Sequence, residues 1–370
     1  MSLLWHEIRK NPLLWLLVFV PAVLAAEHLF HASGQVLFIL SVLAIVPLAA
    51  LLSHATESVA AKTGDAVGGL LNATLGNLTE LVIALTALGA GQYLLVKASI
   101  AGAIVTNALF MLGASLLLGG LRYHTQEFNA ATARLQAGQL FLATIALLVP
   151  SIVGVTNTDA AAGPAFIAKL SLSLAVLLIV VYALGLLFSL KTHKEFFGSA
   201  KRADAADEHE GEPWPMTMAL ITLAGVTVLV ALVSEVFVAS VQEAAEGMGM
   251  SPAFVGFVVV ALVGAAAEMA SAFSGARKNR LDLSVGIALG SAAQIALFVA
   301  PVLVLLSYVI GPAPMNLQFW PGAVVMMLIA TMTVALVTNS GRSAWFVGVL
   351  ILLVYLIFAM TLYLLPPRVQ

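Results

Sequence analysis

The 370-residue chain contains no cysteine, and only 9% of its residues are charged. The absence of cysteine excludes disulfide bonds, thiolate metal ligands and cysteine nucleophiles. Soluble domains carry about 25% charged residues, so this chain has too few charges for a water-exposed surface. The motifs His-Glu-x-x-His, Gly-x-Gly-Asp and Gly-x-Ser-x-Gly are also absent, which argues against an enzyme built on them. We therefore expect no enzymatic activity and no cofactor.

Long apolar runs take the place of the missing charges. Hydrophobic residues make up 61% of the chain, and residues 283–341 contain no Asp, Glu, Lys or Arg. A helix needs about 20 apolar residues to cross the hydrocarbon core of a bilayer, so this stretch alone is long enough for two spans and a turn. The sequence predicts an all-α polytopic membrane protein that works in the lipid bilayer, with no role in binding nucleic acid.

Breaks at Gly, Pro and charge clusters predict eleven transmembrane helices. These spans lie near residues 12–30, 35–54, 66–89, 94–120, 128–153, 164–190, 215–244, 251–275, 282–311, 319–339 and 344–366. With the N-terminus in the cytoplasm, only Lys97, Lys169 and Arg368 of the 16 Lys and Arg residues lie outside. Cytoplasmic loops are rich in Lys and Arg. We therefore expect a cytoplasmic N-terminus, an external C-terminus and a bacterial or archaeal inner membrane.

A charged loop divides the predicted spans into two halves. We expect an extra N-terminal helix in residues 1–34, a first five-helix repeat in 35–190, an acidic cytoplasmic linker in 191–214 and a second five-helix repeat in 215–370. Mixed charges of this kind are typical of a solvated linker, and a role of its acidic residues in attracting cations is the alternative.

The two halves resemble each other in sequence. The stretch VGGLLNATLGNLTELVIAL (67–85) aligns without gaps to VGFVVVALVGAAAEMASAF (255–273), which places Gly76 on Gly264 and Glu80 on Glu268. Further on, Asn107 faces Gln294. Five spans separate the starts of the two repeats, so the repeats are predicted to be inverted. Inverted repeats with interrupted helices are typical of secondary transporters, whose substrate site lies near the bilayer midplane.

Glu80 and Glu268 lie near the middle of their predicted spans. A charged side chain there costs about 3 kcal/mol or more, so such residues usually mark an ion pathway. Two carboxylates with amide and backbone oxygens form a hard oxygen shell that suits calcium, and their joint charge suits a divalent ion. The sequence therefore predicts that Glu80 and Glu268 bind a metal cation or protons in turn. A structural salt bridge is the alternative, but neither helix core offers a Lys or Arg.

For the other polar residues near these helices, the sequence leaves two interpretations open. Asn107 and Gln294 are either cation ligands or amides that hold helices together. A second group lies toward the predicted helix ends and is a candidate for gating or for a proton path, with a solvated helix cap as the alternative. This group is Glu57, Glu243, Glu235 and His54.

The motif GNLTELVIALTAL, preceded by GGLLNATLGN, and the motif VGAAAEMASAF, followed by KNRLDLSVGIALGSAAQIALFVAP, resemble the two repeat signatures of the calcium/proton exchangers. These form a branch of the calcium/cation antiporter superfamily, and their repeats read roughly GNATE and GNAAE. The resemblance covers residues 50–340. It implies ten core helices in two inverted sets of five after one N-terminal helix, in agreement with the eleven predicted spans.

Carried over by position, the resemblance implies that Glu80 and Glu268 are the essential cation-binding acids. The surrounding positions are Gly76, Asn77, Thr79, Gly264, Asn107, Thr106, Ser291 and Gln294. The second motif departs from the family in one place, because Ala265 stands where the family usually has Asn. The pocket thus lacks one amide oxygen, and this bears on calcium affinity and on the identity of the cation.

The predicted function is secondary antiport that exports Ca²⁺ from the cytoplasm in exchange for H⁺. Sodium/calcium or sodium (potassium)/proton exchange within the same superfamily is the alternative, although the Ser- and Pro-containing repeats of sodium-coupled relatives are absent. A passive channel is a further alternative, which inverted repeats disfavour. Calcium, manganese and sodium all remain open as the physiological ion, and a homo-oligomer is open as well.

Overall fold

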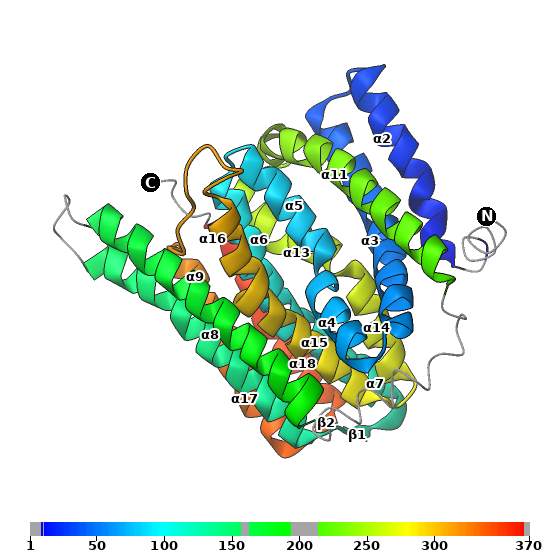
Figure 1. The fold of residues 1–370 in the computed structure, drawn as a ribbon, viewed down its shortest axis with the longest axis vertical. Helices are drawn as coiled ribbons and strands as arrows, with labels where there is room; N and C mark the ends of the chain where they lie inside the picture. Colours follow the sequence, from blue (N-terminus) through cyan, green and yellow to red (C-terminus); the bar gives the residue numbers. More distant parts are fainter. Residues whose placement is uncertain (1–8, 10, 157–162, 194–213, 366–370) are drawn as a thin grey trace.

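Helices make up most of the computed structural model of this protein (Figure 1). The structure describes residues 9, 11–156, 163–193 and 214–365. The elements of the first half are η1 (Pro12–Val18), α2 (Phe19–His28), α3 (Gly34–Lys62), α4 (Asp65–Leu75), α5 (Leu78–Gly89), α6 (Tyr93–Val105), η2 (Thr106–Met111), α7 (Leu112–Tyr123), β1 (Thr125–Glu127), α8 (Ala130–Thr156), α9 (Gly163–Leu187) and η3 (Phe188–Thr192). Those of the second half are α11 (Met216–Gly247), α12 (Pro252–Phe254), η5 (Val255–Val260), α13 (Ala261–Gly264), α14 (Ala266–Arg277), α15 (Leu281–Gln294), η6 (Ile295–Val299), α16 (Ala300–Leu306), α17 (Pro321–Val337), η7 (Thr338–Ser340), β2 (Arg342–Ala344) and α18 (Trp345–Leu364).

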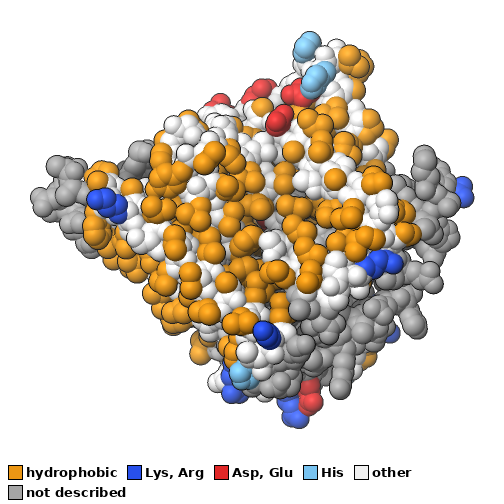
Figure 2. All heavy atoms as spheres, in the orientation of Figure 1, with side chains coloured by type: hydrophobic (Ala, Val, Ile, Leu, Met, Phe, Trp, Pro, Cys, Tyr) orange, Lys and Arg blue, Asp and Glu red, His pale blue; other side chains and the backbone are white. Residues whose placement is uncertain are grey.

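The described helices include eight that are long and apolar enough to cross a membrane, or ten if each of two bent helix pairs counts as one span. Hydrophobic side chains cover the middle of the face in Figure 2, and charged side chains lie mainly near its margins. The polytopic membrane fold is therefore confirmed. The predicted first span corresponds to a shorter apolar helix, Pro12–His28, so the count of eleven stays a prediction.

The two bent pairs interrupt the helices at matched positions. Val67–Leu75 and Leu78–Gly89 meet at 44°, and Pro252–Gly264 and Ala266–Arg277 meet at 59°. At the first break Asn77 has φ −99° and ψ 28°, and at the second Ala265 has φ −80° and ψ 6°. These ψ values lie outside the helical range and interrupt the backbone hydrogen bonds of the helix. The sequence alignment predicted this pairing of Gly76 with Gly264.

The long helices α3 and α11 lie side by side and join the two halves (Figure 1). The first residue of α3 lies near the end of α11, because the Gly34 backbone N–H donates to the Glu243 carboxylate at 2.9 Å. Further along, the rings of Phe38 and Phe237 stack at 5.2 Å. The two helices are thus antiparallel, as an inverted arrangement of the halves requires. The linker that was predicted to separate the halves lies mostly outside the described residues.

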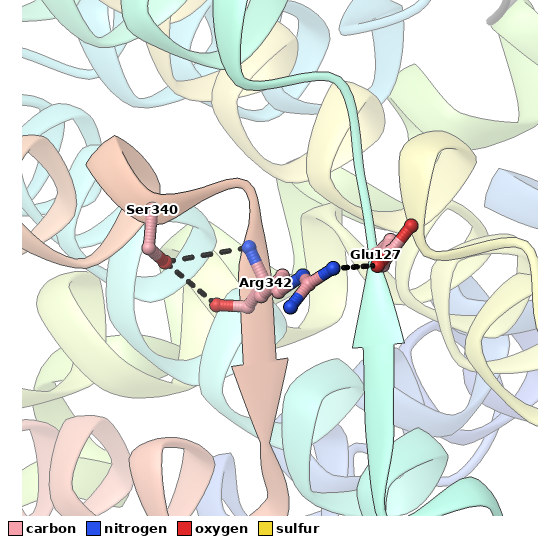
Figure 3. A network of polar contacts seen from close by, with 3 residues as sticks. All are labelled: Glu127, Ser340 and Arg342. Atoms are coloured by element: carbon pink, nitrogen blue, oxygen red, sulfur yellow. Dashed lines mark hydrogen bonds and ion pairs between the residues drawn. The ribbon is translucent and has the colours of Figure 1, made fainter.

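A two-stranded antiparallel sheet, which the sequence did not predict, joins the loop after α7 to the loop before α18. At its surface Arg342 forms an ion pair with Glu127 at 2.7 Å, and the Ser340 hydroxyl bonds the Arg342 backbone on both sides (Figure 3). Both charged side chains are exposed, so the pair contributes at most about 1 kcal/mol. The sheet ties together two helix connections from different halves.

Helix α6 crosses η5 with almost no space between the backbones. A Cβ atom on Gly102 would lie 2.6 Å from the Phe257 carbonyl carbon. Likewise, a Cβ on Gly256 would lie 2.7 Å from the Cβ of Ala98 and 2.9 Å from the Leu95 carbonyl oxygen. Small residues at such crossings let transmembrane helices approach closely. This crossing therefore fixes the distance between the first half and the broken helix of the second half.

We expect Gly102→Ala to destabilise the protein by about 1 to 3 kcal/mol, because the added methyl group meets backbone that cannot move aside. Gly138→Ala in α8 is the matched control, since a Cβ there has nothing within 4 Å. Thermal unfolding in detergent, followed by fluorescence, measures both variants. Equal melting temperatures would show that the crossing has room to adjust.

Candidate functional site

Glu80 and Glu268 occupy equivalent positions at the two breaks. Asn77 precedes α5 and Ala265 precedes α14, so each Glu is the third residue of the half-helix that follows. The N-terminal end of a helix carries partial positive charge, which favours a carboxylate in its first turn. Each break therefore supplies a local reason for an acid to be tolerated at this depth.

The two acids have no cationic partner among the described residues. Glu80 packs on Gly264, four residues before Glu268, and no described Lys, Arg or His forms an ion pair with either acid. The side chain of Glu80 is 8% exposed, and Glu268 is half-buried. A structural salt bridge, the alternative considered from the sequence, is therefore absent from the described part of the chain.

Several buried polar atoms of the predicted site residues have no hydrogen-bond partner. These atoms are Glu80 Oε1, Glu268 Oε2, Asn77 Oδ1 and both amide atoms of Asn107. A buried polar atom left without a partner costs about 1 to 3 kcal/mol. Four of the five atoms are oxygens, so the unsatisfied capacity is that of an oxygen-ligand site for a hard cation or for protons.

One amide pair connects the first break to the second half. Asn77 Nδ2 donates to Gln294 Oε1 at 2.7 Å. In the sequence alignment the counterpart of this pair would join position 265 to Asn107, but position 265 is Ala. Asn107 is fully buried, and neither atom of its amide has a partner. The family departure predicted at Ala265 therefore coincides with an unsatisfied amide in the structure.

Glu80 also packs against the break of the other half. A Cβ atom built on Gly264 would lie 2.8 Å from Cγ, 3.1 Å from Cδ and 3.3 Å from Oε1 of Glu80. On the first break, a Cβ on Gly76 would lie 3.9 Å from Gln294 Oε1. The two glycines thus lie beside site residues that come from the opposite half.

The remaining predicted ligands divide into two groups. Ser291 interacts with Glu268 through its hydroxyl, and Thr79 is buried next to Glu80 in the chain. Thr106 instead donates to the Tyr355 hydroxyl of α18 at 3.2 Å. Thr106 therefore contributes to helix packing. Asn107 lies within the π-helical segment η2, and Gln294 directly precedes the π-helical segment η6, a type of turn often found at functional sites.

The predicted gating residues have contacts with residues other than the acid pair. Glu57 is exposed and accepts a hydrogen bond from Ser53 at 3.0 Å, although its charge still acts on Glu268. Glu235 is exposed on α11, and Glu243 binds the Gly34 backbone at the start of α3. The His54 ring packs edge-on against Trp214 at 4.4 Å. Their roles in gating stay predictions.

Two tyrosines near the site were not predicted. The Tyr182 hydroxyl of α9 donates to the Ala73 carbonyl at 2.8 Å, four residues before Asn77. Its ring stacks on Phe298 at 5.1 Å. Tyr355 binds Thr106 as described above. The sequence held one usable signal, because a buried phenol hydroxyl within an apolar helix requires a partner.

Among the described residues, no three Asp, Glu or His side chains gather in a way that could hold a metal ion. The candidate site in this part of the chain thus has two carboxylates, and the unpartnered side-chain oxygens of Asn77 and Asn107 are the further oxygen atoms that the predicted site residues offer.

Known proteins are similar to this chain over nearly its full length. The family model described as sodium/calcium exchanger protein matches residues 33–191 and 218–364. A Ca(2+)/H(+) antiporter of Aphanothece halophytica is 38% identical over 97% of this chain and 98% of its own. A Ca(2+)/H(+) antiporter of Synechocystis is 40% identical over 96% and 97%.

The solved structure of native YfkE superposes with a TM-score of 0.81 at 35% identity and covers 96% of this chain and 100% of its own. The named relatives are transporters and not enzymes. On the match to both halves and on these identities, the chain belongs to the sodium/calcium exchanger protein family.

Proposed function

We propose that this protein is a secondary antiporter that exchanges Ca²⁺ for H⁺ across a bacterial or archaeal inner membrane. The single observation that carries this proposal is the pair Glu80 and Glu268, which lie at the two breaks, have no cationic partner among the described residues and each have an unpartnered buried oxygen. The relatives named as Ca(2+)/H(+) antiporters over nearly the full chain support the choice of ions.

The chemistry of the two carboxylates explains why calcium and protons would exchange for each other. Two adjacent carboxylates in a low-dielectric interior are costly when both are charged and uncompensated. A divalent cation cancels both charges, and protons remove them. Calcium and protons therefore compete for the same oxygens, and the empty charged site is the least stable state during a change of access.

Alternating access would arise from the broken helices. The half-helices on either side of Asn77 and Ala265 are joined by residues that interrupt the backbone hydrogen bonds, so each half-helix can tilt without breaking an entire span. The antiparallel α3 and α11 pack against these helices from both halves. We infer that a shift of this pair opens the acids to one side of the membrane at a time.

The direction of transport follows from the predicted orientation. With the basic helix ends in the cytoplasm, an inward proton gradient would drive calcium out of the cell. This orientation is inferred from the distribution of Lys and Arg in the sequence.

Counterflow in proteoliposomes tests the function. Purified protein is reconstituted with an internal pH dye and given external calcium, and calcium uptake and proton release are followed together. Calcium accumulation above the external concentration should require an outward proton gradient and should collapse with a protonophore. Uptake that persists without the proton gradient and requires sodium would instead establish the sodium-coupled alternative.

Ala265→Asn should strengthen calcium binding, because the new amide adds an oxygen at the break and gives Asn107 a partner. A net gain of about 1 kcal/mol for one hydrogen bond corresponds to about a 5-fold lower half-saturating calcium concentration. Ala265→Val, which adds bulk without an amide, is the control. An equal change of the half-saturating calcium concentration in both variants would mean that the new amide oxygen does not bind calcium and that the site uses other oxygens.

A further inference from the structure

A polar cavity lies between α7 and α14. It has a volume of about 440 Å³ and is lined by Arg122, Ala270, Phe273, Ser274, Arg277 and Lys278. The lining comes from the ends of α7 and α14, which pack against each other. None of these lining residues is acidic. The cavity therefore combines positive charge with an apolar wall.

The cavity faces away from the cation site. Ala270, Phe273, Ser274 and Arg277 follow an i, i+3, i+4, i+7 spacing on α14, which places them on one face of this helix. At 100° per residue, these four side chains point about 140° to 240° away from the direction of Glu268. The residues that line the cavity are thus on the opposite side of α14 from the acid, and the cavity is not a vestibule of the ion site.

The depth of the cavity matches the boundary between lipid tails and headgroups. Arg277 is the last residue of α14, which begins at the break beside Ala265. Eleven residues of helix span about 17 Å, and half the hydrocarbon core of a bilayer is about 15 Å thick. If the break lies near the midplane, Arg277 reaches the headgroup level, whereas Ala270 and Phe273 stay at the depth of the acyl chains.

Most guanidinium N–H donors of Arg122 and Arg277 are available to a ligand. Arg122 Nη1 donates to the Arg277 carbonyl oxygen at 3.1 Å, and the Tyr123 hydroxyl donates to the same oxygen at 3.1 Å. These bonds satisfy the carbonyl end of α14 and use one of five guanidinium N–H groups of Arg122. Neither Arg122 nor Arg277 forms an ion pair with a carboxylate among the described residues. Both guanidinium groups can therefore bind a phosphate.

From this combination we propose that the cavity between α7 and α14 binds the headgroup of an anionic phospholipid. The phosphate contacts Arg122 and Arg277, Ser274 supplies a hydroxyl, and an acyl chain lies along Ala270 and Phe273. A free phosphate ion would use the arginines but not the apolar wall. Because α14 also carries Glu268 on its other face, a lipid bound here contacts the half-helix that must move during exchange.

Native mass spectrometry of the detergent-purified full chain tests the site. Phosphatidylglycerol is titrated against phosphatidylcholine, which carries no net charge. The double variant Arg122→Gln and Arg277→Gln should weaken phosphatidylglycerol binding about 5-fold per lost charge, or about 25-fold in all. Unchanged binding in this variant, or equal binding of both lipids by the original protein, would overturn the proposal.

A second double variant serves as the matched control. Lys62→Gln and Arg342→Gln remove the same charge, but neither residue lines the cavity, and Arg342 is paired with Glu127. Its phosphatidylglycerol binding should stay within about 2-fold of the original, since its charges lie outside the site. An equal loss in both double variants would indicate general surface attraction and would refute a defined site.

Inorganic phosphate distinguishes the lipid from a soluble anion. At millimolar concentration it should leave phosphatidylglycerol bound, because it lacks the acyl chain. Complete displacement would identify a site for small anions and overturn the lipid proposal. These outcomes do not depend on transport, so they separate the lipid site from the proposed exchange function.

Discussion

Glu80→Gln and Glu268→Gln should each reduce calcium/proton exchange by on the order of 100-fold, because calcium sites are tuned by the number of charged ligands. Glutamine keeps the volume and one oxygen of glutamate but neither binds nor releases a proton. Both variants should still fold, since the acids have no ion pair to lose among the described residues. Calcium-driven proton release from proteoliposomes is the measurement, with unfolding temperature as the check on folding.

Glu127→Gln provides the matched control for this pair. Glu127 is an exposed acid in β1 whose partner is Arg342, and its loss removes one negative charge far from the breaks. Exchange by this variant should remain at the original rate. Normal exchange by either Glu80→Gln or Glu268→Gln would remove that residue from the proposed mechanism. If a variant loses exchange but also unfolds at a lower temperature than the original protein, the loss of exchange would be explained by misfolding and not by a role in ion binding.

The location of the acids could be predicted because rare residues carry most of the information in an apolar chain. Leu and Val match by chance between any two membrane helices, whereas Gly76 with Gly264 and Glu80 with Glu268 do not. The same alignment paired Gly76 with Gly264, each of which directly precedes a break in the structure, since glycine weakens a helix wherever it occurs. The long apolar runs predicted a polytopic membrane fold, although the count of eleven spans stays a prediction.

The direction of some side chains could not be predicted, and Thr106 shows why. Thr106 begins the π-helical segment η2, and a π turn holds an extra residue compared with an α turn. Each such insertion rotates the following side chains relative to a regular 3.6-residue period. The family resemblance therefore predicts that Thr106 lies near the site but not the direction of its side chain. In the structure its hydroxyl donates to the hydroxyl of Tyr355.

Contacts between distant loops could not be predicted from the sequence for a different reason. Each strand of the sheet formed by Thr125–Glu127 and Arg342–Ala344 has only three residues, too few to show an alternating pattern. The bond from Tyr182 to the Ala73 carbonyl likewise depends on which helices become neighbours. Such pairs follow from the packing of the whole chain and leave no local trace in the sequence.

Gly264→Ala should abolish most exchange while leaving the fold intact. The new Cβ would lie 2.8 Å from Glu80 Cγ, well inside the 3.5 to 4.0 Å at which carbon atoms attract. The backbone is not the obstacle, since Gly264 lies at the end of a helix and has no positive φ. The side chain of Glu80 has to move instead, and its carboxylate then leaves the position beside Glu268.

The expected loss of apparent calcium affinity is about 10-fold or more, which corresponds to at least about 1.4 kcal/mol. Gly286→Ala is the control, because it makes the same change in α15 where a Cβ has nothing within 4 Å. Calcium-dependent proton release and unfolding temperature are measured for both variants. Equal unfolding temperatures and equal calcium-dependent proton release for Gly264→Ala and the control would contradict this prediction. Glu80 would then function without its packing against the second break, and the acid pair would be more mobile than this contact implies.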